Sequence, residues 1–329
     1  MPPALQFPSS QLQSPLRNFI ALQGDLLLIL GPRHVPPLAS PVPNTYTGIS
    51  VLTAVGFGML ESEYYAEAVQ KLRPDIAIGI GDIVFGQKPG VKRLEAMGDR
   101  TLAWTEELIS ELADNDERAW KTALFAPILP IDLGQQNHYL DALADEFRGN
   151  ISGLVVYDVS SIEAIPEELY HLPRLSLMEL SSPQRLLDEI CLGIDIFTVP
   201  FVGAATDAGI ALDFSFPVEQ GDSSRGLLPL GIDMWSNVYA TDLAPLRLDC
   251  SCYACRNHHR AYLQHLLGAK EMLGWVLLQL HNHHIIDEFF AGVRRSIANG
   301  SFDNERVRFG QSYEEALPTK TGQGPRYVT

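Results

Sequence analysis

The chain has 329 residues, of which 46% are hydrophobic, and its formal net charge is −16. That composition is typical of a globular protein with one large core or two smaller ones. The acidic balance weighs against a strong nucleic-acid binder, because such proteins neutralise phosphates with Lys and Arg. No apolar run reaches the roughly 18 residues that cross a bilayer, and the start, MPPALQFPSS, lacks the basic and apolar regions of a signal peptide.

The first 44 residues predict little regular structure. Short apolar runs flank Gln23-Gly24-Asp25, which predicts a hairpin. The prolines of residues 31–48 predict a loop, because proline fixes φ and has no backbone N–H to donate.

From residue 45 onward, helical and apolar segments alternate. The predicted helices are 61–72, 90–114, 138–147, 161–172 and 182–193, and the predicted buried strands are 75–81, 122–129, 152–159, 174–180 and 194–201. Such alternation is typical of a parallel sheet with crossover helices. Five or six successive units favour a (β/α) barrel over a doubly wound sheet. Gly79 and Gly81 lie in or at the end of a strand rather than opening a helix, so a dinucleotide site is not favoured.

The alternation breaks after residue 216. A loop, a strand-like piece at 232–240 and two helices at about 258–267 and 269–298 are predicted next. The expected organisation is an N-terminal hairpin and loop (1–44), barrel units (45–216), a cysteine-containing subdomain with closing helices (217–310) and a polar tail (311–329).

Three of the four cysteines, Cys250, Cys252 and Cys255, fall within six positions. Without a secretory signal, clustered thiols indicate a metal or catalytic site rather than a disulfide framework. The spacing C-x-C-x2-C lets three thiolates reach one zinc ion from a tight loop. Packed thiols without a metal are the plainer alternative, and no base is evident beside a catalytic thiol. The spacing leaves the fourth ligand open among His258, His259, His265, His281, His283 and His284.

A longer pattern resembles a known family. The thiols, the following RAYLQHLL and the LHN that begins 30 residues after Cys250 resemble the zinc signature of the queuine tRNA-ribosyltransferases, or tRNA-guanine transglycosylases. The resemblance reaches upstream to LRPDIAI and VKRLEAMGDRTLAW and covers roughly residues 45–300. It implies a TIM (β/α) barrel, here with a divergent or incomplete N-terminal part, and a C-terminal zinc-binding subdomain. It implies one Zn²⁺ per chain, held by Cys250, Cys252, Cys255 and His281, and places His283 and His284 on a helix surface or at an interface.

The resemblance also implies a reaction, the exchange of guanine in tRNA for queuine or a precursor. One Asp of the family attacks the ribose C1′, and a second Asp acts as general acid and base. Two segments resemble the nucleophile segment, GIDIFTVPF at 193–201 and GIDMWSNVY at 231–239. The first is preferred, because it ends a βα unit and is followed by AGIALDFSF.

The carboxylate is absent from the nucleophile position in either segment. That position holds Thr198 in the first and Ser236 in the second, whereas Asp195 or Asp233 belongs to the strand end. No segment like the DSGGFQ of the family occurs, and Asp82 aligns only loosely with a base-recognising Asp.

A chain that keeps the zinc signature but lacks both carboxylates resembles the non-catalytic accessory subunit of the eukaryotic enzyme. This resemblance implies a heterodimer with a catalytic queuine tRNA-ribosyltransferase subunit, which exchanges guanine for queuine at the tRNA wobble position and contacts tRNA through the complex. It implies a cytoplasmic location and allows peripheral association with the mitochondrial outer membrane. Candidate interface residues, each of which could instead belong to the chain's own core, are Leu263, Leu266, Leu267, Phe289 and Phe290. Candidate basic contacts, which could instead be solvated helix faces, are Arg256, Arg260, Arg294 and Arg295.

Two alternatives stay open at this point. The chain could be a divergent, self-sufficient transglycosylase that uses another acid such as Asp207 or Asp242. It could also be a zinc-stabilised scaffold unrelated to tRNA modification.

Overall fold

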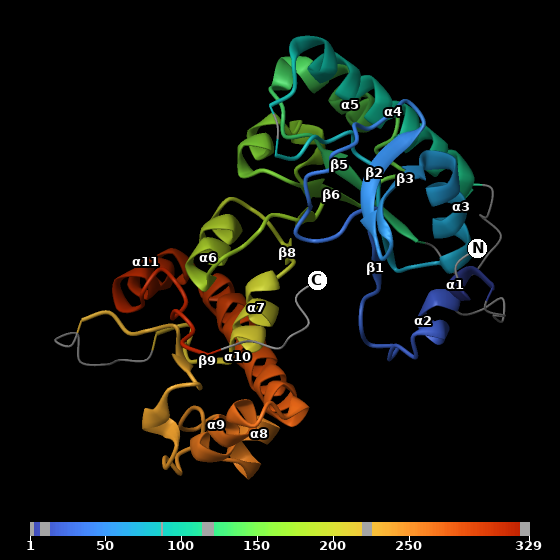
Figure 1. The fold of residues 1–329 in the computed structure, drawn as a ribbon. Coiled ribbons are helices and arrows are strands. Elements are labelled where there is room, and N and C mark those ends of the chain that lie inside the picture. Colours follow the sequence, from blue (N-terminus) through green and yellow to red (C-terminus); the bar gives the residue numbers. More distant parts are fainter. Residues whose placement is uncertain (1–2, 7–13, 87, 114–121, 219–225, 323–329) are drawn as a thin grey trace. The chain divides into compact units, whose positions relative to one another are not determined.

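The protein divides into two compact units in a computed structural model that describes residues 3–6, 14–86, 88–113, 122–218 and 226–322 (Figure 1). The first unit consists of Met1–Met178 with Leu192–Thr198, and the second of Glu179–Cys191 with Val199–Thr329.

A parallel sheet of six strands organises the first unit (Figure 1). In spatial order its strands are β1 (Ile29–Leu30), β4 (Ile76–Ile78), β5 (Ala123–Ile128), β6 (Gly153–Val156), β7 (Arg174–Ser176) and β8 (Ile196–Phe197). Every neighbouring pair is parallel, with β1 and β8 as the two edge strands. The predicted parallel α/β architecture is therefore confirmed, as a curled, half-barrel sheet.

Three long helices cover this sheet, and they match predicted helical segments. They are α3 (Ser62–Leu72), α4 (Val91–Ala113) and α5 (Leu133–Asp145), with α4 packed against both of the others. Buried tyrosines join helices to strand ends: the Tyr65 hydroxyl donates to the Ile78 carbonyl at 2.7 Å and the Tyr139 hydroxyl to the Pro127 carbonyl at 2.9 Å. These phenols give their buried hydroxyls a partner at the carboxyl ends of β4 and β5.

Two sequence predictions for this unit are wrong. The residues around Gln23-Gly24-Asp25 do not form a hairpin: α1 (Pro3–Gln6) and α2 (Pro15–Phe19) precede β1, which pairs in parallel with β4. The cause is a distant contact, because the Asp75 carboxylate accepts hydrogen bonds from the Leu28 N–H at 2.6 Å and from Arg17. The hairpin of this unit is instead β2 (Gly48–Thr53) with β3 (Gly56–Glu61), where Gly56 adopts φ 113°.

The predicted helix 161–172 is replaced by two short 3₁₀ turns, η1 (Val159–Ala164) and η2 (Glu167–Leu169). Pro166 lies between them, where it forces the preceding Ile165 out of the helical region, to φ −67° and ψ 127°. Pro166 therefore prevents the continuous helix that the apolar periodicity of this segment predicted.

The second unit is largely helical. Its elements are α6 (Pro183–Cys191), α7 (Pro200–Ala208), β9 (Ile210–Leu212), β10 (Gly231–Asp233), η4 (Asn237–Tyr239), α8 (Tyr253–Asn257), α9 (Arg260–Gly268), α10 (Met272–Ala298) and α11 (Phe302–Ser312). The two long helices predicted after the cysteines are confirmed as α9 and α10. Helices α7 and α11 were not predicted, although α7 begins at a proline and ends before Gly209 at φ 77°, as helices commonly do.

An aromatic cluster forms the centre of this unit. Phe214 meets Phe289 of α10 edge to face with ring centroids 5.6 Å apart, and Phe309 of α11 at 6.1 Å. Phe216 packs against the same two rings. The segment after β9 is thus held between α10 and α11.

In the described part of the chain, none of the helices combines the length and apolar character that crossing a membrane requires.

The approach of α10 to residue 216 predicts a sensitive position. Gly292 on α10 lies so close to the Phe216 carbonyl that an added Cβ would overlap the oxygen. We expect Gly292→Ala to lower the free energy of unfolding by about 1–3 kcal/mol or more, because the packed segment must move. The measurement is the urea midpoint of unfolding. Gly268→Ala is the matched control, since its Cβ meets no atom within 4 Å, and equal effects of both substitutions would contradict the prediction.

Candidate metal centre

Four side chains of the second unit converge on one point. The thiols of Cys250, Cys252 and Cys255 and the His281 imidazole present ligand atoms that all lie within 4.8 Å of one another. The three Sγ atoms lie 3.8, 3.5 and 3.4 Å from His281 Nδ1. A tetrahedral zinc site, with Zn–S of ~2.3 Å and Zn–N of ~2.0–2.1 Å, requires S–N separations of about 3.6 Å. The cluster therefore has the donor atoms and the dimensions to hold such an ion.

The loop and helix α8 present the thiols together. Asp249 turns the chain with φ 60°, and Cys250 follows it. Cys252 is the N-cap of α8, and its Sγ accepts the Cys255 N–H at 3.3 Å. This cap brings Cys252 and Cys255 together at the first turn of α8.

His281 reaches the thiols from the interior of α10. It is fully buried, and its Nε2 lies 2.9 Å from the Leu212 carbonyl of β9. A carbonyl only accepts, so Nε2 carries the proton and Nδ1 keeps its lone pair toward the thiols. Orientation of a histidine ligand by a backbone carbonyl is the arrangement that metal sites commonly use.

Burial controls the protonation of the four groups. Desolvation lowers the pKa of His281 to about 4, against the opposing effect of the Leu212 carbonyl, so the ring is neutral near pH 7. Burial also raises the pKa of the Cys250 and Cys255 thiols. A divalent cation reverses the preference of the thiols, because its charge favours thiolate. Four protein ligands would leave no open position on a tetrahedral ion, which is the arrangement of structural rather than catalytic zinc sites.

Asn282, next to His281, was not identified from the sequence. It is fully buried, and its amide donates to Thr206 Oγ1 at 2.9 Å and to the Ile210 carbonyl at 3.0 Å. Its Oδ1 accepts the Leu212 N–H at 2.8 Å. Asn282 thus binds both ends of β9 while His281 binds the same strand. The only sequence signal was its place in the LHN stretch.

The other candidate histidines do not join the cluster. His283 is exposed beside Gln279, and His284 contacts Ser251 and Glu288. Near the start of α9, His259 caps the helix through its Nδ1, and His258 stacks on Tyr262. His265 is exposed. Among the described residues, His281 is the histidine that the fold brings to the three thiols.

The residues at the nucleophile positions have structural contacts. Thr198 follows β8, and its hydroxyl donates to the Ser176 carbonyl at 3.4 Å, a contact that does not activate it. Asp195 accepts the Arg174 N–H at 2.9 Å and so belongs to the strand end. In the other segment Ser236 follows β10, where Asp233 accepts the Trp235 N–H at 3.1 Å. Neither segment places a carboxylate at its nucleophile position.

Two of the three acidic candidates, Asp82 and Asp242, form hydrogen bonds and ion pairs. Asp82 is fully buried, accepts the Asn44 amide at 2.8 Å, and pairs with Arg93 and with Arg100. In the second unit, Asp242 accepts the Ala244 N–H at 2.9 Å and pairs with Arg260 at 3.0 Å; both contacts lower its pKa. Asp207 is exposed.

The candidate interface residues are mostly core residues. Leu263, Leu266, Leu267 and Phe289 are buried inside the second unit, so the expectation that they meet a partner is wrong for these four. Phe290 is half-buried and touches Phe289. The helical periodicity indicated an apolar face correctly, but the chain covers that face itself.

Comparison with known proteins gives consistent matches. The profile of a family described as queuine tRNA-ribosyltransferase matches residues 8–315. The chain is 37% identical to the Schizosaccharomyces pombe protein named queuine tRNA-ribosyltransferase accessory subunit 2, over 94% of this chain and 70% of the relative. Proteins of the same name are 28% identical in Drosophila mojavensis, over 83% of this chain and 68% of the relative, and in Ixodes scapularis, over 90% and 80%.

The contacts of Asn282 predict that it is essential for the second unit. Asn282→Leu keeps the volume but leaves the Leu212 N–H and the Ile210 carbonyl without this partner. Each buried group left unsatisfied costs about 1–3 kcal/mol, so we expect a loss of roughly 2–6 kcal/mol in unfolding free energy, read by urea denaturation. Asn257→Leu, at an exposed position whose amide bonds only Tyr253, should change little. Equal stability of the two variants would contradict this role.

Proposed function

We propose that this chain, which belongs to the queuine tRNA-ribosyltransferase family, is the non-catalytic accessory subunit of a tRNA-guanine transglycosylase. The observation that carries the proposal is the 37% identity, over 94% of the chain, to a relative named as that accessory subunit. The proposed complex exchanges guanine for queuine at the tRNA wobble position, and a catalytic homologue performs the chemistry in the cytoplasm.

The lack of catalysis follows from the chemistry that the reaction requires. Displacement at a ribose carbon through a covalent intermediate needs a carboxylate nucleophile, and the departing purine needs an acid. Thr198 offers a hydroxyl whose hydrogen bond goes to the Ser176 carbonyl. Asp82, the one acid that aligned with a base-recognising residue, is buried between Arg93 and Arg100 and has no free face for a base.

In this proposal the metal is a structural Zn²⁺ and the first unit is the remnant of a (β/α) barrel. Cys250, Cys252, Cys255 and His281 would hold the ion, which supplies a cross-link between the cysteine loop and α10. Because the thiols come from the loop and the imidazole from the helix, binding of the ion and folding of this region are coupled. The six parallel strands with their crossover helices supply most of the strands of such a barrel.

An apolar stripe on α10 is the surface that we assign to the catalytic partner. It consists of Met272, Leu273, Val276 and Leu280, which are between 45% and 77% exposed. Residues 272, 276 and 280 are four apart and therefore lie on one face of the helix. Large apolar side chains gathered on an exposed helix face mark a protein interface, and this face belongs to the same helix that carries His281.

A self-sufficient enzyme that uses Asp207 or Asp242 has less support. Asp242 is fixed by the Ala244 N–H and by Arg260, contacts that favour its ionised form but occupy its oxygens. A covalent RNA adduct formed by the chain alone would be the result that favours this alternative.

The metal assignment predicts zinc content. Chain purified without added metal should carry about one equivalent of zinc, measured by plasma mass spectrometry, and Cys252→Ser should carry much less because one of four ligands is lost. Cys191→Ser is the matched control: Cys191 is an exposed thiol outside the cluster, and its loss should leave the zinc content unchanged. Well under one equivalent in the unmodified chain would contradict the assignment.

The subunit assignment predicts activity only in a pair. The purified chain alone should not incorporate labelled guanine into tRNA, whereas co-expression with a catalytic homologue should yield a complex that does. Val276→Asp should weaken that complex by roughly a hundredfold or more, because it places an unpaired charge in the apolar contact. Val307→Asp, at a similarly exposed valine of α11, is the control. Incorporation by the chain alone would refute the assignment, and equal affinity of both variants would refute the surface.

A further inference from the structure

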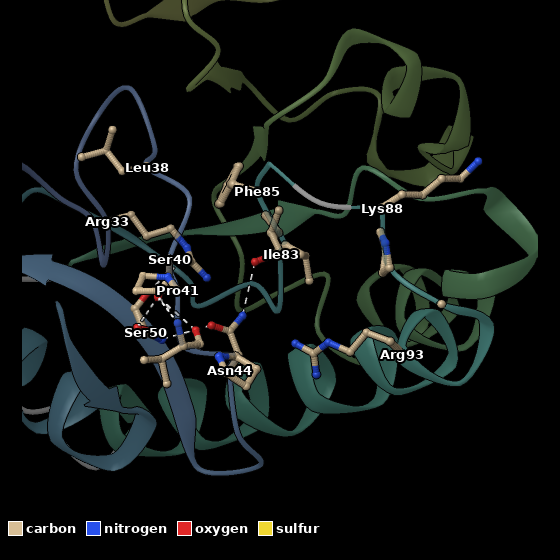
Figure 2. Close-up of a pocket in the computed structure, with 15 residues that line it drawn as sticks. Arg33, Leu38, Ser40, Pro41, Asn44, Ser50, Ile83, Phe85, Lys88 and Arg93 are labelled. Atoms are coloured by element: carbon tan, nitrogen blue, oxygen red, sulfur yellow. Dashed lines mark hydrogen bonds between the residues drawn. The ribbon is translucent and has the colours of Figure 1, made fainter.

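The first unit contains a cavity that none of the roles above uses (Figure 2). Its volume is about 400 Å³, within the range of about 300–1,000 Å³ typical of small-molecule sites. The lining comes from residues 33–50, which follow β1, and from residues 83–85 and 88–93, which follow β4. The cavity therefore lies beyond the carboxyl ends of two adjacent parallel strands, where open α/β sheets bind their ligands.

The charge of this cavity is opposite to that of the protein. Its described lining includes three basic residues, Arg33, Lys88 and Arg93, and no Asp or Glu. The whole chain has 40 acidic and 24 basic residues. A net charge of −16 repels anions from the protein in general, so a local excess of cations marks a place where an anion can nevertheless bind.

Arg33 has more N–H donors than hydrogen-bond partners. Its Nη1 donates to the Ser50 carbonyl at 3.4 Å and its Nη2 to the Gly81 carbonyl at 3.2 Å, while Nε is buried without a partner. A guanidinium has five N–H donors, so most are unused. Among the described residues no carboxylate lies within ion-pair distance of Arg33; only the Phe85 ring lies against it, 5.3 Å away. A partly buried cation that faces a cavity without an anion is an incomplete pair.

The neighbouring cations differ in how firmly they are placed. Arg93, at the start of α4, is fixed by the buried Asp82, which Asn44 and Arg100 also hold. Figure 2 shows the guanidinium groups of Arg33 and Arg93 on either side of Asn44 and Ile83, whereas the Lys88 ammonium points away from them at the rim. The buried Asp82 carboxylate is thus already paired with Arg93 and Arg100, and it acts on Arg33 only from beyond ion-pair distance.

We propose that this cavity binds a phosphate group, with the Arg33 guanidinium as its principal ligand. A planar guanidinium matches phosphate oxygens in a bidentate manner. Leu38, Val42 and Phe85 give the cavity an apolar wall for the organic part of a phosphate ester. The same chemistry would accept a free nucleotide or a phosphodiester of RNA. The proposal is independent of the subunit assignment and of the metal centre.

The first experiment compares probes on the full-length chain by titration calorimetry. The probes are adenosine 5′-monophosphate, adenosine as the matched compound without phosphate, and a tRNA transcript. Arg33→Gln should weaken binding of the phosphate-bearing probe by roughly tenfold or more, because charge-assisted hydrogen bonds are lost. Arg148→Gln, an equal change of charge at an exposed arginine outside the cavity, should leave binding unchanged.

A second pair of variants keeps the test decisive if Arg33→Gln does not fold. Val42 lines the cavity at 48% exposure, so Val42→Glu adds a carboxylate there without disturbing the core and should abolish phosphate binding. Val55→Glu, at a valine 98% exposed in the turn between β2 and β3, is its control. Binding of the monophosphate but not adenosine assigns a free nucleotide, and cavity-dependent binding of the transcript alone assigns RNA. If the cavity variants bind both phosphate-bearing probes as tightly as their control variants do, the proposal is wrong.

Discussion

Two neighbouring side chains on α10 bind the backbone of β9, and the second unit depends on that contact. His281 donates to the Leu212 carbonyl, while Asn282 accepts the Leu212 N–H and donates to the Ile210 carbonyl. Water cannot replace these bonds, because both side chains are fully buried. The contact joins a strand to a helix some 70 residues later in the chain, and it also turns His281 Nδ1 toward the thiols. The fold and the metal centre therefore share one set of hydrogen bonds.

The two units have diverged in different ways from the chemistry of the family. The second unit keeps a complete set of metal-ligand atoms, and each is placed by backbone contacts such as the Cys252 cap of α8. The first unit keeps the parallel sheet, has a threonine at position 198, which we propose to match the family's nucleophile, and binds its buried Asp82 to two arginines. A sheet that retains its shape while its carboxylates are replaced or neutralised can support a partner, and it can also acquire a different ligand. The cationic cavity beside Arg33 belongs to this altered part of the molecule.

Local patterns predicted the elements wherever periodicity and proline agreed. Helix α4 and helix α10 are long and amphipathic, and both were predicted to within a few residues. The predictions were wrong where a distant residue or a single proline determined the local backbone structure. The Asp75 carboxylate binds the Leu28 N–H, so the chain continues into the parallel strand β1 instead of forming a hairpin. Pro166 divides a periodic segment into two 3₁₀ turns. Short helices such as α7 were missed because nine residues carry little periodic signal.

The sequence by itself determined which chemical groups this protein has: three thiols in one tight loop, histidines one helix later, and no carboxylate at position 198. Spacing alone left six histidines as candidates, because each lies within reach of a loop that can fold in several ways. The family resemblance singled out His281 among them, and the tertiary structure brings His281 to the thiols. Only the tertiary structure decided that its Nε2 carries the proton and that Leu263 and Phe289 are core residues. The tertiary structure also decided the contacts of Asp82 and Arg33, because their partners come from loops and helices distant in the chain. Residue identity is local, whereas burial and pairing depend on contacts between distant segments.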